Sequence, residues 1–316
     1  IRDPQEANHE ARELQARAAQ EVEANRALEQ QKLGTLSPAD RARYQDLARV
    51  CDKDPAARLS LQMMLFDGRL PGSTRSAEGR TLLEDLHETS TQPVVDGIQR
   101  DSLVSDMVQE IYDPASISQK GKGTCAATSA MIAVARDDPA EYARLVRGLA
   151  SPGGRVTLRN GDSMGREEGT ASEDGSSRTQ SERLLAASLM EYGKKWLGYD
   201  NAKDTHFGGA RGLGVDDTDR ILEGMTGRKW DARSVGNDRD AARLAEDMDR
   251  ALENGGPVLA GLDWGAIDSG VVHGRHKVMV TDMTDSTVTY VNPWGQVEQM
   301  PRDEFITRLN NANIPA

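Results

Sequence analysis

The chain has 316 residues, a formal net charge of −12 and 37% apolar residues, which suits one large folded domain or two modest ones. The acidic charge argues against nucleic acid or an anionic membrane as the main partner, and no apolar run is long enough for a membrane span. Two cysteines, Cys51 and Cys125, are too few for a disulfide framework or a cysteine zinc site. The useful question is whether either thiol has a chemical role.

The first seventy or so residues predict a helical module. Residues 5–31 are polar and rich in Ala and Glu, with a thin apolar stripe at helical spacing, so we expect a surface helix. Ser37-Pro38 and Asp54-Pro55 each combine an N-cap with a proline at the first helical position, and Gly68 is placed to end the second of these helices. We therefore predict an N-terminal helical module at residues 1–72, joined by a linker to a second domain.

The predicted second domain, residues 73–316, has helices first and strands later, which predicts an α+β fold. Arg155 to Leu158, followed by the Asn160-Gly161 turn signal, predicts a small hairpin, and residues 161–177 predict a mobile surface loop. The other expected elements are helices at 103–111, 125–135, 139–149, 182–192, 216–225 and 238–252, and antiparallel strands at 257–262, 277–281 and 287–291.

Cys125 stands at the start of an uncharged apolar helix, directly after a glycine-containing loop. A helix N-terminus has unpaired N–H groups and a partial positive charge, both of which favour a nucleophilic thiolate. Gln119, six residues earlier, is placed to form an oxyanion hole with the backbone N–H of Cys125. Gly121 and Gly123 would let the backbone pass closely beneath a substrate. Cys51 instead lies on an apolar helical face and reads as a core residue.

A nucleophilic thiol needs a base, and the sequence favours His276 among the five histidines. His276 stands at the entrance of a predicted strand, and Asn292 follows the next strand. In a hairpin these two positions are neighbours, so the Asn292 oxygen is placed to accept from the imidazole. We expect Trp294 to cover that hydrogen bond. The remaining histidines, for which no role is expected, are His9, His87, His206 and His273.

Three rival interpretations rank lower. His273 and His276 have a spacing that could hold a metal on a helix, but they precede a strand and no cysteine or carboxylate cluster is nearby. Asp282 and Asp285 compete with Asn292 for orienting the histidine, although Asp282 falls near the far end of the same strand. Gly212-Leu213-Gly214 lacks the preceding strand and the third glycine of a nucleotide fingerprint. No metal and no cofactor is expected.

The order of Gln119, Cys125, His276 and Asn292, with Gln six residues before Cys, resembles the papain-like cysteine peptidase superfamily. The turn Asn292-Pro293-Trp294-Gly295 looks most like that of its calpain-type members. The resemblance implies that residues 73–316 are the catalytic domain, in which a helical half that carries the nucleophile helix faces an antiparallel sheet half, with the active site between them. It implies Cys125 as nucleophile, His276 as base and acid, Asn292 as orienter and Gln119 as oxyanion donor, and it rests on about thirty residues.

The sequence also departs from that pattern. Ala126 stands where a Trp usually follows the nucleophile, and Arg275 and Lys277 flank His276 where small residues are common. These departures bear on substrate preference more than on the chemistry, and they fit a secreted bacterial toxin or effector better than a digestive protease.

The expected function is a thiol-dependent amide hydrolase, most simply a cysteine protease acting on a protein or peptide. Glutamine deamidation, transglutamination and acyl transfer share the same acyl-enzyme and stay open as alternatives. A non-catalytic interaction module on the same scaffold is the alternative from another class. The N-terminal helices are in that case a binding element, and in an enzyme they are a chaperone-binding or inhibitory segment. If they cover the cleft, truncation near Gly72 raises activity.

Overall fold

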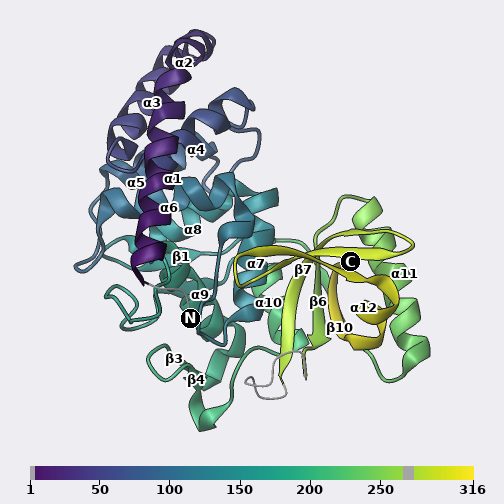
Figure 1. The fold of residues 1–316 in the computed structure, drawn as a ribbon. Coiled ribbons are helices and arrows are strands. Elements are labelled where there is room, and N and C mark those ends of the chain that lie inside the picture. The colour runs from purple at the N-terminus through teal and green to yellow at the C-terminus, as the bar shows by residue number, and fades with distance from the viewer. Residues whose placement is uncertain (1–3, 266–273) are drawn as a thin grey trace.

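The computed structural model describes residues 4–265 and 274–316, and within them a large helical part adjoins a six-stranded sheet (Figure 1). Helices come first along the chain and most strands come later, so the expected α+β class is confirmed. In the part of the chain that is described, no helix is long and apolar enough to cross a membrane.

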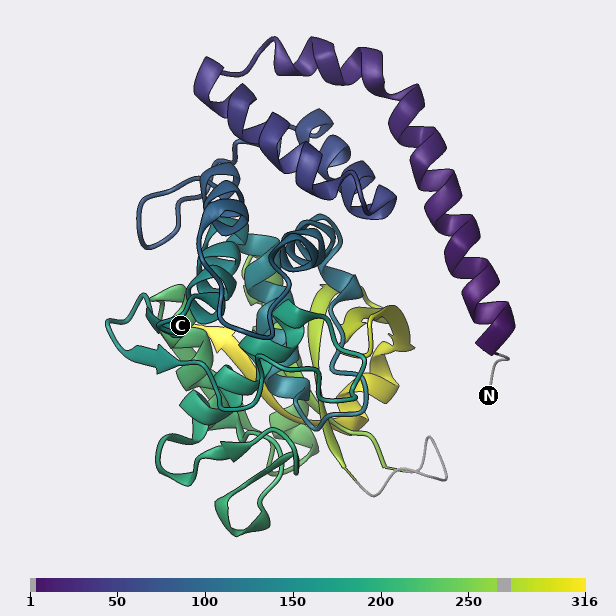
Figure 2. The same cartoon turned by 90° about the vertical axis from the view of Figure 1, so that its left-hand side faces the viewer.

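The N-terminal helices begin where their capping residues predict. The Ser37 side chain accepts from the Asp40 N–H at 3.1 Å, and Asp54 accepts from Ala56 and Ala57 at 3.1 and 3.3 Å. Gly68 has a φ of 72°, the left-handed conformation that ends a helix. The expected helix at 5–31 is in fact two helices that meet at Asn25 (Figure 2). The four elements are α1 (Pro4–Ala24), α2 (Arg26–Leu33), α3 (Pro38–Cys51) and α4 (Pro55–Phe66).

The next helices form the centre of the helical part. One of them, α5, was not expected from the sequence, although Thr81 and Glu84 form a capping box at its start. A single connected apolar core includes Leu33 on α2 and extends to Val291 in the sheet. The boundary at residue 72 therefore stays a prediction. These helices are α5 (Leu82–Thr91), α6 (Arg100–Tyr112), α7 (Cys125–Asp137), α8 (Pro139–Ala150), α9 (Gln180–Lys194) and α10 (Val215–Thr226).

The hairpin expected near Asn160 is present, as β1 (Arg155–Thr157) pairs with β2 (Ser163–Gly165). The expectation of a surface loop over 161–177 was only partly right. Met164 and Thr170 are buried, and Glu167 is buried with its side chain accepting from the Asn201 N–H at 3.2 Å. A second small ladder pairs β3 (Tyr199–Asp200) with β4 (Thr205–His206).

The main sheet is antiparallel throughout, in the order β5-β10-β6-β7-β8-β9. The three strands expected from the sequence are its neighbours β6, β7 and β8, and β5, β9 and β10 were missed. The strands are β5 (Trp230–Ser234), β6 (Val258–Asp263), β7 (Arg275–Met283), β8 (Thr287–Asn292), β9 (Gln296–Pro301) and β10 (Leu309–Pro315).

Helices cover both faces of this sheet (Figure 1). On one face α7 packs against β7, and α10 packs against β5 and β10. The residues of this face, among them Leu259, Met279 and Val291, belong to the same apolar core as Leu33 on α2. On the other face α11 (Asp238–Glu253) and α12 (Arg302–Arg308) pack on a second core that includes Val278 and Tyr290. The helix that begins at Cys125 thus lies between the helical part and the sheet.

Candidate active site

Cys125 is the first residue of α7, and the following residues 126–135 are all buried. Cys125 as a residue is partly exposed, whereas Cys51 is wholly buried. The two cysteines therefore differ as the sequence predicts, with one in a core and one at a partly exposed helix N-terminus. Further along α7, the Ser129 hydroxyl donates to the Lys277 carbonyl at 3.0 Å, which fixes the helix against β7.

His276 and Asn292 lie together on neighbouring strands of the sheet. Nε2 of His276 is 2.9 Å from Oδ1 of Asn292, and both residues are buried. The expected hydrogen bond between these side chains is therefore present. Asn292, rather than Asp282 or Asp285, is the partner of the imidazole.

The orientation of the Asn292 amide determines which imidazole nitrogen carries the proton. Its Nδ2 donates to Glu298 Oε1 at 3.1 Å, and a carboxylate can only accept, so Oδ1 must face His276. An amide oxygen also only accepts, so Nε2 of His276 is the donor. In the neutral ring Nδ1 is then unprotonated, and it is the nitrogen that can take a proton from a thiol.

Two tryptophans enclose the imidazole. The Trp294 ring stacks on His276 with ring centroids 4.5 Å apart, as expected for a residue that covers the hydrogen bond to Asn292. Trp264, which the sequence analysis did not single out, meets the His276 ring edge-on at 4.8 Å. The two indoles limit the orientations of the ring and reduce its contact with water.

The loop before Cys125 is attached to the turn that contains Asn292. The Gln119 N–H donates to the Pro293 carbonyl at 2.7 Å, and Ser118 forms a β-bridge with Trp294. This contact brings the expected oxyanion donor and the expected orienting residue into one neighbourhood. The Ser118 N–H also donates to the buried Glu182 at 2.6 Å, which anchors the loop on α9.

The Gln119 side chain and Gly123 differ from expectation. Gln119 Nε2 donates to the Lys122 carbonyl at 2.6 Å. This N–H is therefore directed into the loop itself and not at the thiol. A Cβ on Gly123 would lie 3.2 Å from the Asp204 carboxylate, which accepts from the Gly123 N–H at 2.7 Å. The need for glycine at this position thus comes from Asp204.

The expected thiolate is not the favoured form of Cys125 in the free protein. Burial raises the pKa of the Cys125 thiol, and the backbone N–H and the positive charge of Lys277 only partly oppose that rise. Burial likewise lowers the pKa of His276, against the Asn292 hydrogen bond and the charge of Glu298, which raise it. Desolvation penalises both charged forms, so at rest Cys125 is a thiol and His276 a neutral imidazole, and no hydrogen bond joins these two side chains in the part of the chain that is described.

Among the described residues, no group of three or more His, Cys, Asp and Glu side chains is arranged to hold a metal ion. His273, the partner of His276 in the rival metal hypothesis, lies outside the described residues. Two other histidines have structural partners, since His206 Nδ1 is 2.8 Å from the Gly198 carbonyl and His87 is 3.0 Å from Asp46.

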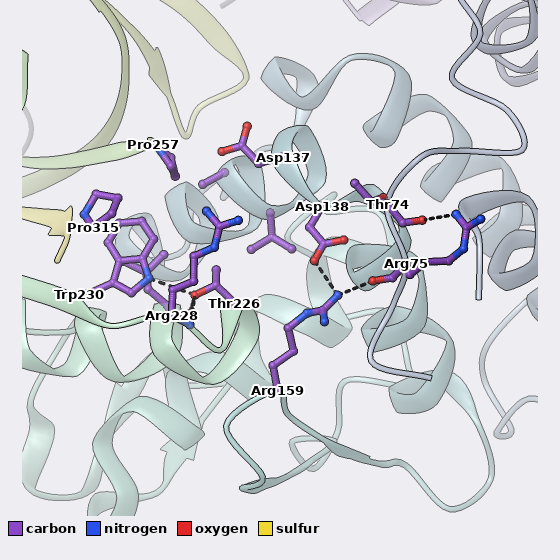
Figure 3. Close-up of a pocket in the computed structure, with 13 residues that line it drawn as sticks. Thr74, Arg75, Asp137, Asp138, Arg159, Thr226, Arg228, Trp230, Pro257 and Pro315 are labelled. Carbon is purple, nitrogen blue, oxygen red and sulfur yellow. Dashed lines mark hydrogen bonds and ion pairs between the residues drawn. The ribbon is translucent and has the colours of Figure 1, made fainter. Parts of the chain in front are cut away.

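A well-formed cavity of about 300 Å³ lies elsewhere (Figure 3). It adjoins Asp137 at the C-terminal end of α7, and Trp230, Arg159 and Arg228 also line it. None of the six expected site residues does so. This cavity is therefore separate from the candidate active site.

Comparison of the sequence with protein-family models and with curated proteins found no match.

Proposed function

We propose that the protein is a thiol-dependent amide hydrolase in which Cys125 attacks a carbonyl, His276 moves the proton and Asn292 holds the histidine. The observation that carries this proposal is the 2.9 Å hydrogen bond between His276 and Asn292. Two features bring Cys125 to the strand that carries His276. The helix α7, which begins at Cys125, packs on this strand, and the backbone N–H of Lys277, the next residue on the strand, faces the sulfur.

The chemistry starts from the neutral pair. Nδ1 of His276 takes the proton of Cys125 as the sulfur forms its bond to the substrate carbonyl carbon, and the carbonyl electrons move to oxygen. The imidazolium then gives its proton to the leaving amine, and the acyl-enzyme remains. A water molecule, deprotonated by Nδ1, attacks the acyl-enzyme, and the sulfur leaves with that proton. Because the pair is neutral at rest, proton transfer accompanies the attack.

The backbone N–H of Cys125 is the first candidate for stabilising the oxyanion. Gln119 is the second, because its Nε2 has another N–H besides the one given to Lys122. Its Oε1 is buried and bonds to no group among the described residues, so a small rotation of this side chain breaks no bond at that atom. We expect the Gln119 amide to reorient towards the carbonyl oxygen when a substrate binds.

The proposal includes a papain-like arrangement of the two parts of the fold. Support comes from the position of α7 between the helices and the sheet, with His276 and Asn292 on the sheet side (Figure 1). A protein or peptide is the first choice of substrate, as the residue order is that of a peptidase superfamily. Hydrolysis, deamidation and transfer to an amine remain outcomes for the experiment to separate.

The first test is alkylation of the folded protein with iodoacetamide at about pH 7, where an ordinary thiol of pKa about 8.5 reacts slowly. The labelled residue is mapped by mass spectrometry. We expect Cys125 to react in the wild type, because Nδ1 of His276 takes its proton as the sulfur is alkylated, and to react at least about tenfold more slowly in His276→Ala, since a positioned base contributes that much or more. Cys51 is wholly buried, so its labelling reports unfolding. Equal labelling of Cys125 in both proteins would overturn the proposal.

The second test identifies the reaction. The wild type and Cys125→Ala are incubated with a denatured protein, with and without an added primary amine, and the products are analysed by mass spectrometry. New peptide termini indicate a protease, Gln converted to Glu indicates a deamidase, and incorporated amine indicates a transferase. Products that are equal in wild type and Cys125→Ala would contradict the proposed role of this cysteine.

A further inference from the structure

Lys277 follows His276 directly on β7 and is buried, with 5% of its surface exposed. Burying an ammonium is costly unless it is paired, so a buried lysine beside a reactive group calls for an explanation. Its hydrogen-bond partners are uncharged, as Nζ donates to Oδ1 of Asn311 at 2.5 Å and to Oδ1 of Asn313 at 2.7 Å. The amide oxygens solvate the ammonium without neutralising it.

The sheet provides a passage for this side chain. Lys277 pairs with Gly261 on β6, and Gly261 pairs in turn with Asn311 on β10. Because Gly261 has no side chain, Lys277 and Asn311 meet across it, and a Cβ there would lie 2.4 Å from Asn311 Nδ2. Three strands thus hold the ammonium on the face of the sheet that packs against α7.

The charges around Lys277 come from two helices. From α7, Cys125 lies close enough for its charge to raise the pKa of Lys277, and from α10, Asp219 does the same. Asn313 links Asp219 to Lys277, because its Nδ2 donates to Asp219 at 2.6 Å and its Oδ1 accepts from Nζ of Lys277. On the strand itself His276 is the neighbouring titratable group. Burial outweighs these effects and lowers the pKa of Lys277 to about 7, so the side chain is a cation below about pH 7, and a negative charge on Cys125 favours the cation at higher pH.

We infer that Lys277 is a positioning residue for the nucleophile, a cation held beside Cys125 that stabilises its thiolate together with His276. This inference rests on the proposed function, in which the sulfur becomes negatively charged during proton transfer. Two of the three N–H donors of the ammonium are taken by Asn311 and Asn313. The third is available for the developing charge. The resemblance led us to expect a small residue at this position, so this device is a feature of this chain.

The test is the pH dependence of Cys125 alkylation by iodoacetamide in wild type and in Lys277→Met, from about pH 5 to about pH 11, a range that spans the ordinary pKa values of His, Cys and Lys. Removing the cation raises the pKa of Cys125. At pH values below that pKa, each unit of the rise lowers the thiolate fraction about tenfold. We expect about tenfold slower labelling of Lys277→Met at about pH 7, with the midpoint moved to higher pH.

Two further Lys277 variants separate charge from packing. Lys277→Gln keeps a donor for the asparagine oxygens but carries no charge, so it is expected to behave like Lys277→Met. Lys277→Arg keeps the charge and is expected to recover part of the wild-type rate. Arg275→Gln, which removes an exposed positive charge two positions away, is the matched control and is expected to leave the midpoint unchanged. An unlabelled Cys51 shows that each variant is folded.

The outcomes distinguish this inference from the proposed function. Wild-type rates and midpoints in both Lys277→Met and Lys277→Gln, with slow labelling in His276→Ala, would overturn only the role of Lys277. Recovery by Lys277→Gln would show that the donor matters rather than the charge, and this too would overturn it. Wild-type labelling in His276→Ala would instead overturn the proposed function.

Discussion

Glu298 on β9 accepts a hydrogen bond of 3.1 Å from Nδ2 of Asn292, and the amide cannot turn over without losing it. The second carboxylate oxygen accepts from the Tyr290 hydroxyl at 3.0 Å, so Glu298 is itself held in place. This contact extends the candidate triad by one residue, because the orientation of Asn292 decides which nitrogen of His276 is free to act as base. The charge of Glu298 also raises the pKa of His276, against the effect of burial.

We expect Glu298→Gln to keep the Asn292 contact through its amide oxygen but to lower the pKa of His276 further, because the nearby negative charge is gone. If the pKa of His276 falls by one unit, the imidazolium fraction at a pH above that pKa falls about tenfold. Less Cys125 thiolate can then form beside an imidazolium. Cys125 alkylation at about pH 7 should therefore slow by up to about tenfold. The rate is measured as a function of pH.

Glu298→Ala removes the contact as well as the charge, so Asn292 can turn over and the slowing should exceed that of Glu298→Gln. Tyr290→Phe removes only the hydroxyl that supports Glu298, and a smaller effect is expected. If Glu298→Ala labels Cys125 as fast as the wild type, Glu298 does not determine the orientation of Asn292.

A second prediction concerns Gly261→Ala. The new Cβ would meet Asn311 Nδ2 at 2.4 Å, and β6 is a central strand that cannot easily move aside. We expect a loss of about 1–3 kcal/mol in the free energy of unfolding, typical of overpacking in a core. Displacement of Asn311 should also slow Cys125 alkylation. Urea unfolding and the labelling rate measure the two effects.

Gly165→Ala is the matched control, since a Cβ there comes no closer than 3.9 Å to its neighbours. Unfolding free energies that fall equally in Gly165→Ala and Gly261→Ala would contradict the argument from crowding.

The sequence predicted the parts of the site that depend on local signals. His276 and Asn292 were placed correctly because a hairpin brings the start of one strand beside the end of the next. The environment of Lys277 could not be found in this way. Its partners come from β10, which the sequence analysis missed because Asn310, Asn311 and Asn313 make that strand polar. Only the order of strands in the sheet puts Asn311 opposite Gly261.

The protonation states could not be read from the sequence either. A helix N-terminus suggests a thiolate at Cys125, but burial depends on how the whole chain packs around the sulfur, and burial dominates. Gln119 was predicted to point at the thiol, and the local acceptor, the Lys122 carbonyl, takes its amide instead.

The third prediction concerns buried acids at the start of α9. Asp106 accepts from the Gln180 N–H at 3.0 Å, and burial raises its pKa to about 7. Glu110 is fully buried beside it, with its pKa also raised by burial and by the charges of Glu182 and Asp106. Because the folded pKa of Asp106 exceeds the unfolded value, its contribution to stability is complete below about pH 4 and is lost as the pH rises towards about 7.

Asp106→Asn retains the acceptor for Gln180 and mimics the protonated acid. Each pKa unit corresponds to about 1.4 kcal/mol, so at about pH 8 we expect the variant to exceed the wild type by at least about 1 kcal/mol in free energy of unfolding. The difference should shrink as the pH falls to about 4. Asp96→Asn, at an exposed position, makes the same charge change and should have no such effect. A constant difference at all pH values would contradict the assignment to Asp106.

The last prediction concerns removal of residues 1–72. If these helices covered the cleft, truncation would raise activity, but their contacts lie elsewhere: α3 packs on α5, and α4 packs on α6. Tyr44, Leu47, Leu61 and Met64 are fully or almost fully buried in the shared core. Truncation would expose the matching apolar surfaces of α5 and α6, and burial of each such side chain is worth about 1.5–3 kcal/mol.

We therefore expect residues 73–316 alone to unfold at a lower urea concentration than the whole chain, or to aggregate, without faster alkylation of Cys125. Removal of residues 1–24 is the comparison, because α1 is mostly exposed and only Ala18 is buried among its described side chains. That shorter deletion should cost much less stability. Faster Cys125 labelling in the 73–316 protein, at unchanged stability, would show instead that the N-terminal helices restrict access to the site.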